Sequence, residues 1–405
     1  MKRRSVYAAV IGGGAAGMMC ALRAAENNIG QRIVILEKAD RVGKKLLVTG
    51  NGRCNLSHLG AGADSYHGEG SKELINILFS KYNPDAVLHC FNRIGLLTTA
   101  DSEGRVYPRS NLAASVLDVL RMRLKDHDVD TVCGADIREI RKVRGGFEVI
   151  AQDEIITAEK LIVAVGGKAD YAGRESGASV INDFGLAAVK PTPSLSPVKV
   201  EGDLLRSLKG IRASASVSLI HNGEVVKSER GEVQFTDGAL SGICIFNLSR
   251  YANRHSGCEI AISLLPEMSD DEVFDELSRR IKLNRGGILS DIFVGLFHKN
   301  IGLALIKTAG LKPSASCSDI STEELKTLSK HINNWRFKTV PRHDFKNAQV
   351  TAGGVRLSEI NHHTFETKRH KGLYIIGEAL DIDGDCGGYN LQFAFASGMC
   401  AGDHV

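Results

Sequence analysis

Two short apolar runs near the N-terminus flank a glycine turn and a helical pattern. Residues 6–11 (VYAAVI) predict a buried parallel strand, and the GGGAAG of residues 12–17 then opens a helix rich in Ala, Met and Leu. A second apolar run, residues 32–36, ends at Glu37. Strand, glycine turn, helix, strand and acid follow one another at the spacing of a dinucleotide-binding βαβ unit.

Each residue type in this unit has a physical task. Gly12 allows the tight turn, Gly14 lets the backbone approach a pyrophosphate, and Gly17 lets the helix pack close to the strand. The helix N-terminus offers unpaired N–H groups and the positive end of its dipole to phosphates. Glu37 can accept hydrogen bonds from the hydroxyl pair of a ribose. The pattern therefore predicts a dinucleotide site between residues 12 and 37.

The next 150 residues continue this domain with alternating helix and strand signals. The loop that follows Glu37 is rich in Gly, Asn and basic residues, with little to bury, which is typical of a segment that contacts a ligand. Apolar spacing predicts helices at about 71–91 and 111–124. Strand signals lie near 130–133, 147–150, 155–156 and 161–165, the last ending in Gly166-Gly167.

The pattern changes after residue 190, where three prolines predict a crossover between domains. Alternating residues on both sides of Asn222-Gly223 predict a hairpin of residues 213–219 and 224–228. Residues 250–333 predict a small helical module, with capping residues that begin helices at Ser269 and Ser321. Strand signals return near residues 337–340 and 348–351.

The C-terminal segment repeats the arrangement of the N-terminus. A buried strand at residues 372–378 ends in Gly377-Glu378, and a glycine-dense loop over 381–390 leads into an Ala-rich helix at 391–400. This strand is expected to join the sheet begun by the N-terminus. The chain is therefore predicted to be an α/β protein with a discontinuous Rossmann-type domain and an inserted middle.

Composition narrows the function classes. The 405 residues are 43% hydrophobic and 24% charged, which is typical of a globular protein of more than one domain. With 51 basic and 47 acidic residues and no basic stripe, a nucleic-acid partner is not expected. Apart from the N-terminal stretch up to Leu22, no apolar run approaches the length of a membrane span, so no membrane partner is expected either. The oligomeric state stays open.

Cysteine usage and the N-terminal residues bear on location. The nine cysteines lack paired spacing, which favours a reduced, cytoplasmic setting. Lys2-Arg3-Arg4 and the apolar residues up to Leu22 resemble a signal peptide, but cleavage there would delete the first strand and its glycine turn. Cys54 lies in the ligand-facing loop and is expected to be a small packed thiol, with a redox pair formed with a spatial partner such as Cys386 as the alternative. His362-His363 has no accompanying ligand cluster, so no metal site is expected.

Several motifs together resemble one flavoprotein family. GGGAAGMMCA, GKKLLVTGNGRCNLS, LIVAVGG, FTDGALSG, TAGGV and GLYIIGEALDIDGDCGGYNLQFAFASG are similar to the BaiN-like (YhiN-like) members of the two-dinucleotide-binding-domain flavoproteins. The resemblance covers essentially the whole chain. It implies an FAD-binding Rossmann-type domain (1–190 and 341–405), a β-barrel-like insert (191–249 and 334–340) and a nested helical subdomain (250–333).

The same resemblance implies which residues contact FAD. The N-terminal segments would hold the pyrophosphate, the adenosine and the ribityl chain, and the C-terminal helix start would face the N1/O2 edge of the flavin. The implied positions are Gly12, Gly14, Ala15, Ala16, Gly17, Glu37, Lys38, Lys45, Thr49, Gly50, Asn51, Gly52, Arg53, Cys54, Asn55, Val132, Ala164, Gly166, Gly377, Glu378, Asp383, Gly388, Tyr389, Asn390 and Leu391.

The activity best described in the family is reduction of ring double bonds in 3-oxo bile-acid intermediates, so the resemblance implies an FAD-dependent reductase of the C=C bond of a hydrophobic enone. Such a reaction needs a proton donor and groups that polarise the substrate carbonyl. The candidates are Tyr389, Arg109, Tyr107 and Asp237, in that order. Asp237 and Ile243 depart from relatives that have FTH and SGP, so a role of that histidine would not transfer.

The sequence also bears on the electron donor and on three alternative function classes. No second GxGxxG lies between residues 60 and 405, so either NAD(P)H visits transiently or another electron donor serves. The same gap, with the missing cysteine pair, argues against an NAD(P)H:disulfide reductase. The balanced charge argues against an RNA-modifying flavoprotein. A flavin-binding sensor or interaction protein is the alternative outside the enzymes.

Overall fold

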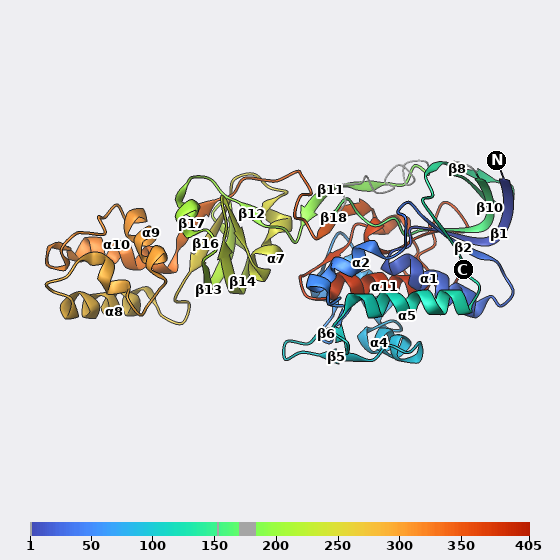
Figure 1. Cartoon of the computed structure of the whole chain (residues 1–405). Coiled ribbons are helices and arrows are strands. Elements are labelled where there is room, and N and C mark those ends of the chain that lie inside the picture. Colours follow the sequence, from blue (N-terminus) through green and yellow to red (C-terminus); the bar gives the residue numbers. More distant parts are fainter. Residues whose placement is uncertain (1, 152–153, 170–183) are drawn as a thin grey trace. The chain divides into compact units, whose positions relative to one another are not determined.

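The computed structural model describes residues 2–151, 154–169 and 184–405 of the chain (Figure 1). The fold is mixed α/β and divides into two compact units. Unit 1 comprises Met1–Pro191 and Gln349–Val405, and unit 2 comprises Thr192–Ala348. The predicted finer division of the insert into a strand part and a helical part stays a prediction.

Unit 1 is built on a largely parallel sheet in the order β7-β2-β1-β10, with β19 beside the end of β10. An antiparallel pair, β9 and β8, extends the sheet from the start of β10. The bounds are β1 Lys2–Ile11, β2 Ile33–Glu37, β7 Asp130–Cys133, β8 Ile137–Val143, β9 Gly146–Ala151, β10 Glu154–Val163 and β19 Leu373–Ile375. The C-terminal strand therefore joins the N-terminal sheet, as the apolar pattern predicts.

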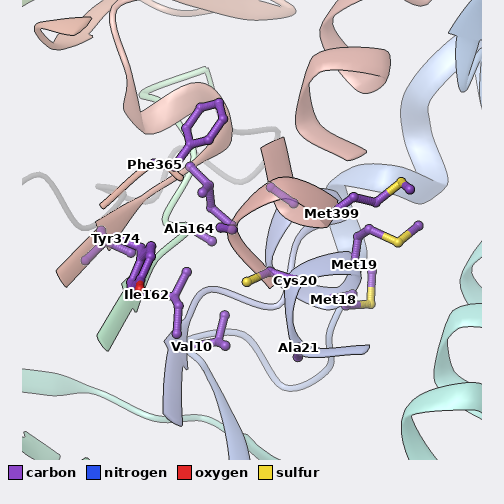
Figure 2. Close-up of a cluster of buried hydrophobic side chains, with 14 of the residues drawn as sticks. Val10, Met18, Met19, Cys20, Ala21, Ile162, Ala164, Phe365, Tyr374 and Met399 are labelled. Atoms are coloured by element: carbon purple, nitrogen blue, oxygen red, sulfur yellow. The ribbon is translucent and has the colours of Figure 1, made fainter. Parts of the chain in front are cut away.

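Two helices that begin after glycine loops pack on each other beside this sheet. These are α1 (Ala15–Asn27) and α11 (Tyr389–Gly402). At Gly398 a Cβ would lie 2.5 Å from the Ala16 carbonyl oxygen, so glycine allows the two backbones to approach. Figure 2 shows Met18, Met19 and Met399 from these helices in the core that also receives Val10 and Ile162 from the sheet. The other helices of the unit are α2 (Lys44–Val48), α3 (Ser71–Phe79), α4 (Pro84–Arg93) and α5 (Ala113–Asp126).

Three small sheets hold the loops of unit 1. They are the antiparallel sheet of β3 (Ser57–His58), β6 (Arg105–Pro108) and β5 (Thr98–Ala100), the pair of β4 (Tyr66–His67) and β20 (Asp383–Gly384), and the pair of β11 (Ala188–Ser194) and β18 (Val350–Val355). The β4–β20 pair matters most for the site, because it ties the C-terminal glycine loop to a segment more than 300 residues earlier in the chain.

Unit 2 contains a six-stranded sheet in the order β12-β15-β14-β13-β16-β17. Directly after its two outer strands, Val200 and Thr339 form a bridge, and the barrel-like form expected for the insert stays a prediction. The strands are β12 Val198–Lys199, β13 Arg212–His221, β14 Glu224–Phe235, β15 Ala239–Ser241, β16 Cys258–Ser263 and β17 Trp335–Lys338. The predicted Asn222-Gly223 hairpin is confirmed as β13 and β14.

The helices of unit 2 are α7 (Ile243–Ala252), α8 (Asp270–Leu283), α9 (Lys299–Thr308) and α10 (Thr322–Asn333). Their apolar faces form a second core around the fully buried Trp335. Short 3-10 helices complete both units: η1 Thr49–Gly52, η2 Ala63–Ser65, η3 Leu204–Leu208, η4 Leu289–Phe293, η5 Cys317–Asp319, η6 Leu357–Glu359 and η7 Gly377–Ala379. Within the described part of the chain, no helix is long and apolar enough to cross a membrane.

Two local predictions were wrong. The helix expected over 71–91 is two helices, because Asn83 caps α4 by accepting the Ala86 N–H and Pro84 occupies the first turn, where its missing N–H costs nothing. The strand signals at 155–156 and 161–165 belong to one strand, β10, which ends at Val163. Its first half pairs with β9 and its second half with β19, so one long strand serves both partners.

Candidate functional site

The turn between β1 and α1 places its glycines where other residues could not fit. Gly12 has φ +102°, and a Cβ there would lie 2.3 Å from the Ala164 carbonyl oxygen. At Gly17 a Cβ would lie 2.0 Å from the carbonyl oxygen of Gly12, whereas Gly14 faces open space. Helix α1 has no side-chain cap and no acid in its first turn. No side chain caps the first N–H groups of α1, and the space beside Gly14 is open, an arrangement that suits an anion.

Glu37 lies at the carboxyl end of β2, next to this turn. Its Oε2 accepts the Gly13 N–H at 2.8 Å and its Oε1 accepts the Ala39 N–H at 2.7 Å. Each carboxylate oxygen keeps a lone pair for a further donor. On the neighbouring strand, Val132 pairs with Leu36. A cavity of about 550 Å³ runs along β7 beside the end of α5, and its lining includes Arg121, Asp130 and Cys133 but not Glu37.

The acid at the end of β19 is brought to the N-terminal loop. Lys45 Nζ lies 2.6 Å from Glu378 Oε2, and Glu378 Oε1 accepts the Thr351 N–H at 2.9 Å. A Cβ at Gly167 would lie 2.5 Å from Glu378 Oε1, so the glycine turn after β10 reaches the same carboxylate. Two residues predicted separately to hold one ligand, Lys45 and Glu378, therefore form an ion pair with each other.

The loop of residues 49–55 contains several backbone conformations that side chains rarely adopt. Gly50, Asn51 and Gly52 follow one another with φ of 56°, 55° and 81°, and Cys54, two residues later, has φ of 60°. Such conformations persist where the surrounding structure demands them, commonly at ligand sites. Cys54 is fully buried, and burial raises the pKa of its thiol to about 12. At neutral pH it is a packed thiol rather than a nucleophilic thiolate.

The cysteine alternatives are resolved by the same geometry. Burial raises the pKa of the Cys386 thiol to about 11, and none of the nine cysteines forms a disulfide bond. The structure thus gives neither thiol the depressed pKa of a dithiol redox centre. In the parts of the chain that the structure describes, no group of three or more His, Cys, Asp or Glu side chains could hold a metal ion.

Tyr389, at the first position of α11, is surrounded by aromatic side chains. Its ring stacks on His58 with centroids 4.5 Å apart and planes 17° apart. The Tyr66 hydroxyl donates to the Tyr389 carbonyl oxygen at 2.9 Å. Burial is the largest cause that lowers the pKa of His58, and its Nδ1 accepts the Gly60 N–H, so the imidazole is neutral near pH 7 with its proton on Nε2.

The other predicted catalytic residues differ in exposure and place. Tyr107 is buried on β6, and the Arg53 guanidinium lies 4.8 Å from its ring centroid. Arg109, just after β6, is exposed. Asp237 lies in unit 2, on the exposed turn between β14 and β15, with its carboxylate 4.0 Å from Arg206. Unit 1 therefore brings Tyr389 and Tyr107 to one aromatic region, because β3, which holds His58, pairs with β6.

The sequence analysis did not identify three residues that contact the predicted site residues: Ser57, His58 and Gln392. His58 and Ser57 close the same loop as Cys54 and Asn55, so their place in the chain was an available signal. Gln392 is fully buried in the first turn of α11 and accepts a hydrogen bond from the Ser57 hydroxyl at 2.7 Å. No pattern around residue 392 distinguishes it from an ordinary helical glutamine, so only the fold shows this contact.

Comparison with known proteins gives similar chains and one family. The profile of the family described as HI0933-like protein Rossmann domain matches residues 6–404. The 3-dehydro-bile acid delta(4,6)-reductase of Clostridium scindens is 33% identical over 97% of this chain and 97% of its own length. The ribosomal RNA dihydrouridine synthase of Escherichia coli is 26% identical over 98% of each chain.

A solved quinol-fumarate reductase with menaquinol molecules resembles the chain in fold. Its TM-score is 0.51 at 13% identity, and the match covers 100% of this chain and 71% of that one. At this level of identity the likeness concerns the fold alone.

Proposed function

This chain belongs to the HI0933-like family of Rossmann-domain proteins, and on that premise we propose that it is an FAD-dependent oxidoreductase that reduces the C=C bond of a hydrophobic enone. A 3-oxo bile acid or related steroid is the proposed substrate, and NAD(P)H is the proposed electron donor. The main structural support is that two uncapped helices, α1 and α11, begin on glycine loops within unit 1. The similarity to the Clostridium scindens reductase supports the substrate class.

The residues present fit FAD at its adenosine and diphosphate end. The open space at Gly14 and the free N–H groups of α1 would receive the diphosphate. Glu37 would accept hydroxyl protons of the ribose with the lone pairs that its two backbone bonds leave. Lys38 and Ala39 follow Glu37 directly, and Val132 on the neighbouring strand β7 pairs with Leu36.

The fit continues at the flavin end. Bound flavin would supply the hydride chemistry. Helix α11 starts at Gly388 with φ +103°, without a side-chain cap or an acid in its first turn. Its N–H groups and positive dipole end would stabilise negative charge at the N1–C2=O edge of the ring. The Lys45–Glu378 pair would bind the ribityl hydroxyls, with lysine as donor and the carboxylate as acceptor.

We place the proton donor at Tyr389. Saturation of an enone adds a hydride to the β carbon and a proton to the α carbon. The proton must come from a group held close to the α carbon. The stacked His58 ring and the bond from Tyr66 fix the Tyr389 ring and backbone. The Arg53 guanidinium covers the Tyr107 ring, so in this proposal Tyr107 supports the loop of residues 49–55. Arg109 is exposed, and we assign it the role of polarising the substrate carbonyl. Asp237 remains a further candidate.

The similarity to ribosomal RNA dihydrouridine synthases supports a second candidate function. Dihydrouridine is uridine with its ring C=C bond saturated, and that bond is conjugated with a carbonyl. Both similar activities are therefore reductions of an activated ring C=C bond. The balance of 51 basic and 47 acidic residues favours the small hydrophobic substrate over RNA.

The visible spectrum of the purified protein under anaerobic conditions tests the proposal. NADH, then NADPH, then a 3-oxo-4-ene steroid would be added in turn, with a uridine-rich ribosomal RNA fragment in a parallel sample. We expect a nucleotide to bleach the flavin and the enone to restore it. Reoxidation by the RNA alone would favour the second candidate. A flavin that neither nucleotide reduces would support another electron donor or a sensor, and a colourless protein that binds no FAD would contradict the cofactor assignment.

Tyr389→Phe tests the proton donor separately. We expect turnover of the enone to fall about a hundredfold, while reduction of the flavin by nucleotide stays unchanged. Tyr82→Phe is the matched control, because the Tyr82 hydroxyl donates to Asp403 elsewhere in unit 1. Stopped-flow absorbance separates the two half-reactions. Unchanged reoxidation in Tyr389→Phe would remove this residue from the mechanism.

A further inference from the structure

Two buried amide groups with unpartnered atoms meet where the loop of residues 54–58 packs on the start of α11. Within the described residues, Asn55 Oδ1 and Gln392 Nε2 have no hydrogen-bond partner. Gln392 is completely buried, and Asn55 is half-buried with its Oδ1 buried. One atom is an acceptor and the other is a donor.

Close contacts tie both groups to Gly388. A Cβ at Gly388 would lie 2.6 Å from Asn55 Oδ1 and 2.4 Å from the Ser57 carbonyl oxygen. The Gln392 N–H donates to the Gly388 carbonyl oxygen at 2.9 Å. The buried Ser57 hydroxyl donates to Gln392 Oε1 at 2.7 Å and so joins the loop to the helix. These contacts form one polar cluster at the uncapped N-terminus of α11.

The unpartnered atoms indicate a ligand with matching groups. A buried amide atom without a partner is unfavourable, so natural proteins seldom keep one unless a ligand or water satisfies it. Here an acceptor and a donor stand beside free helix N–H groups. A flat ring edge with an N–H flanked by two carbonyls complements this set. The pyrimidine end of a flavin, with N3–H between C2=O and C4=O, has that pattern.

We propose that Asn55 and Gln392 recognise the pyrimidine edge of the flavin. Asn55 Oδ1 accepts the ring N3–H, and Gln392 Nε2–H donates to an adjacent ring carbonyl. Ser57 is a positioning residue. Its hydroxyl donates to Gln392 Oε1, which orients the amide so that the Gln392 Nε2–H groups point away from Ser57. The inference rests on the proposed function and adds the residues that select the ring of the cofactor. A buried water between the two amides is the alternative.

The test is the affinity of the full-length apoprotein for FAD and for an FAD analogue methylated at ring N3. Because the methyl group removes the donor, we expect the native protein to bind the analogue about tenfold more weakly than FAD. In Asn55→Ala that ratio falls to near one. Asn76→Ala, an exposed asparagine on α3, is the matched control and keeps the tenfold ratio.

The donor half of the proposal is tested by Gln392→Met, which keeps the side-chain volume and removes the N–H. We expect the reduction potential of the bound flavin to become more negative, because a donor to a ring carbonyl stabilises the reduced ring. Gln31→Met, at an exposed position, leaves the potential unchanged. If Gln392→Met fails to fold, Ser57→Ala, which releases the Gln392 amide, gives the same readout.

The outcomes separate this inference from the proposed function. Equal affinity of the native protein for FAD and the methylated analogue, with tight FAD binding, would overturn the recognition by Asn55 and indicate the water. An unchanged potential in both Gln392→Met and Ser57→Ala would overturn the role of Gln392. Failure of the native protein to bind any flavin would overturn the proposed function as well.

Discussion

The helices of unit 1 that border the proposed site and two helices of unit 2 begin in opposite ways. Helices α1 and α11 start on Gly14 and Gly388, without a side-chain cap or an acid in the first turn. In unit 2, α8 and α10 start with complete capping boxes, Ser269 with Glu272 and Ser321 with Glu324. A capping box satisfies the first N–H groups of a helix with its own side chains.

The two kinds of helix start favour different properties: a side-chain cap favours stability, and an uncapped start favours ligand binding. A capped helix gains about 1 kcal/mol from its cap, and it leaves few donors for a ligand. An uncapped helix on a glycine loop gives up that stabilisation and keeps its N–H groups and dipole for an anion or a polarised carbonyl. Uncapped starts are not confined to unit 1, since α7 of unit 2 begins on Gly242 without a cap. The comparison therefore concerns these four helices: α1 and α11 keep their first N–H groups available, and α8 and α10 do not.

Gly12→Ala should have the largest effect on the unit 1 side of this comparison. The new Cβ meets the Ala164 carbonyl at 2.3 Å and φ is +102°, so we expect a loss of about 3 kcal/mol or more in the free energy of unfolding. Gly14→Ala is the control, since its Cβ meets open space. It should fold normally and bind FAD weakly. Thermal unfolding with and without FAD distinguishes the two. Equal stability of both variants would contradict the packing argument.

Gly388→Ala should follow in size, because its Cβ meets the Ser57 carbonyl at 2.4 Å. We expect flavin affinity to fall about a hundredfold and the free energy of unfolding to fall by about 2 kcal/mol. Gly134→Ala shares the positive φ, +71°, but its Cβ has no neighbour within 4 Å. Fluorescence titration with FAD measures both variants. Similar losses in the two would mean that backbone strain alone, without the contact to Ser57, explains the effect.

Glu37→Gln tests the proposed contact between the Glu37 carboxylate and the ribose of FAD. The variant keeps one acceptor oxygen for the Gly13 and Ala39 N–H groups and loses the charge, so we expect FAD to bind about tenfold more weakly. Glu69→Gln, at an exposed position that pairs with Arg356, should bind FAD as the native protein does. Unchanged FAD affinity in Glu37→Gln would exclude the proposed ribose contact.

Ser321→Ala should have the smallest effect and confine it to unit 2. Loss of the capping box costs about 1 kcal/mol in the free energy of unfolding, with no change in FAD affinity. Trp335, the single tryptophan of the chain, is buried in unit 2, so its fluorescence reports the unfolding of that unit. A lower denaturant midpoint by this probe is expected. A change in FAD affinity would mean that the two units are energetically coupled.

Local patterns predicted much of the fold because they report local physics. The turn at residues 12–17, the hairpin at Asn222-Gly223 and the caps at Ser269 and Ser321 depend on neighbours in sequence, and all formed as expected. The break at Asn83-Pro84 was present in the sequence as a cap and a helix-starting proline, yet apolar spacing on both sides concealed it. The extent of β10 was missed because two different partner strands divide it.

The sequence by itself determined the Rossmann-type unit, the two glycine loops and the family, since these depend on backbone conformations that only particular residues adopt. Tertiary structure alone decided the Lys45–Glu378 pair, the stacking of His58 on Tyr389 and the Ser57–Gln392 bond. The residues of each pair lie more than 300 positions apart, and many polar residues could satisfy the local pattern at either end. Which of them meet is decided by the packing of α11 and of the 3-10 turn Gly377–Ala379 against the N-terminal loop.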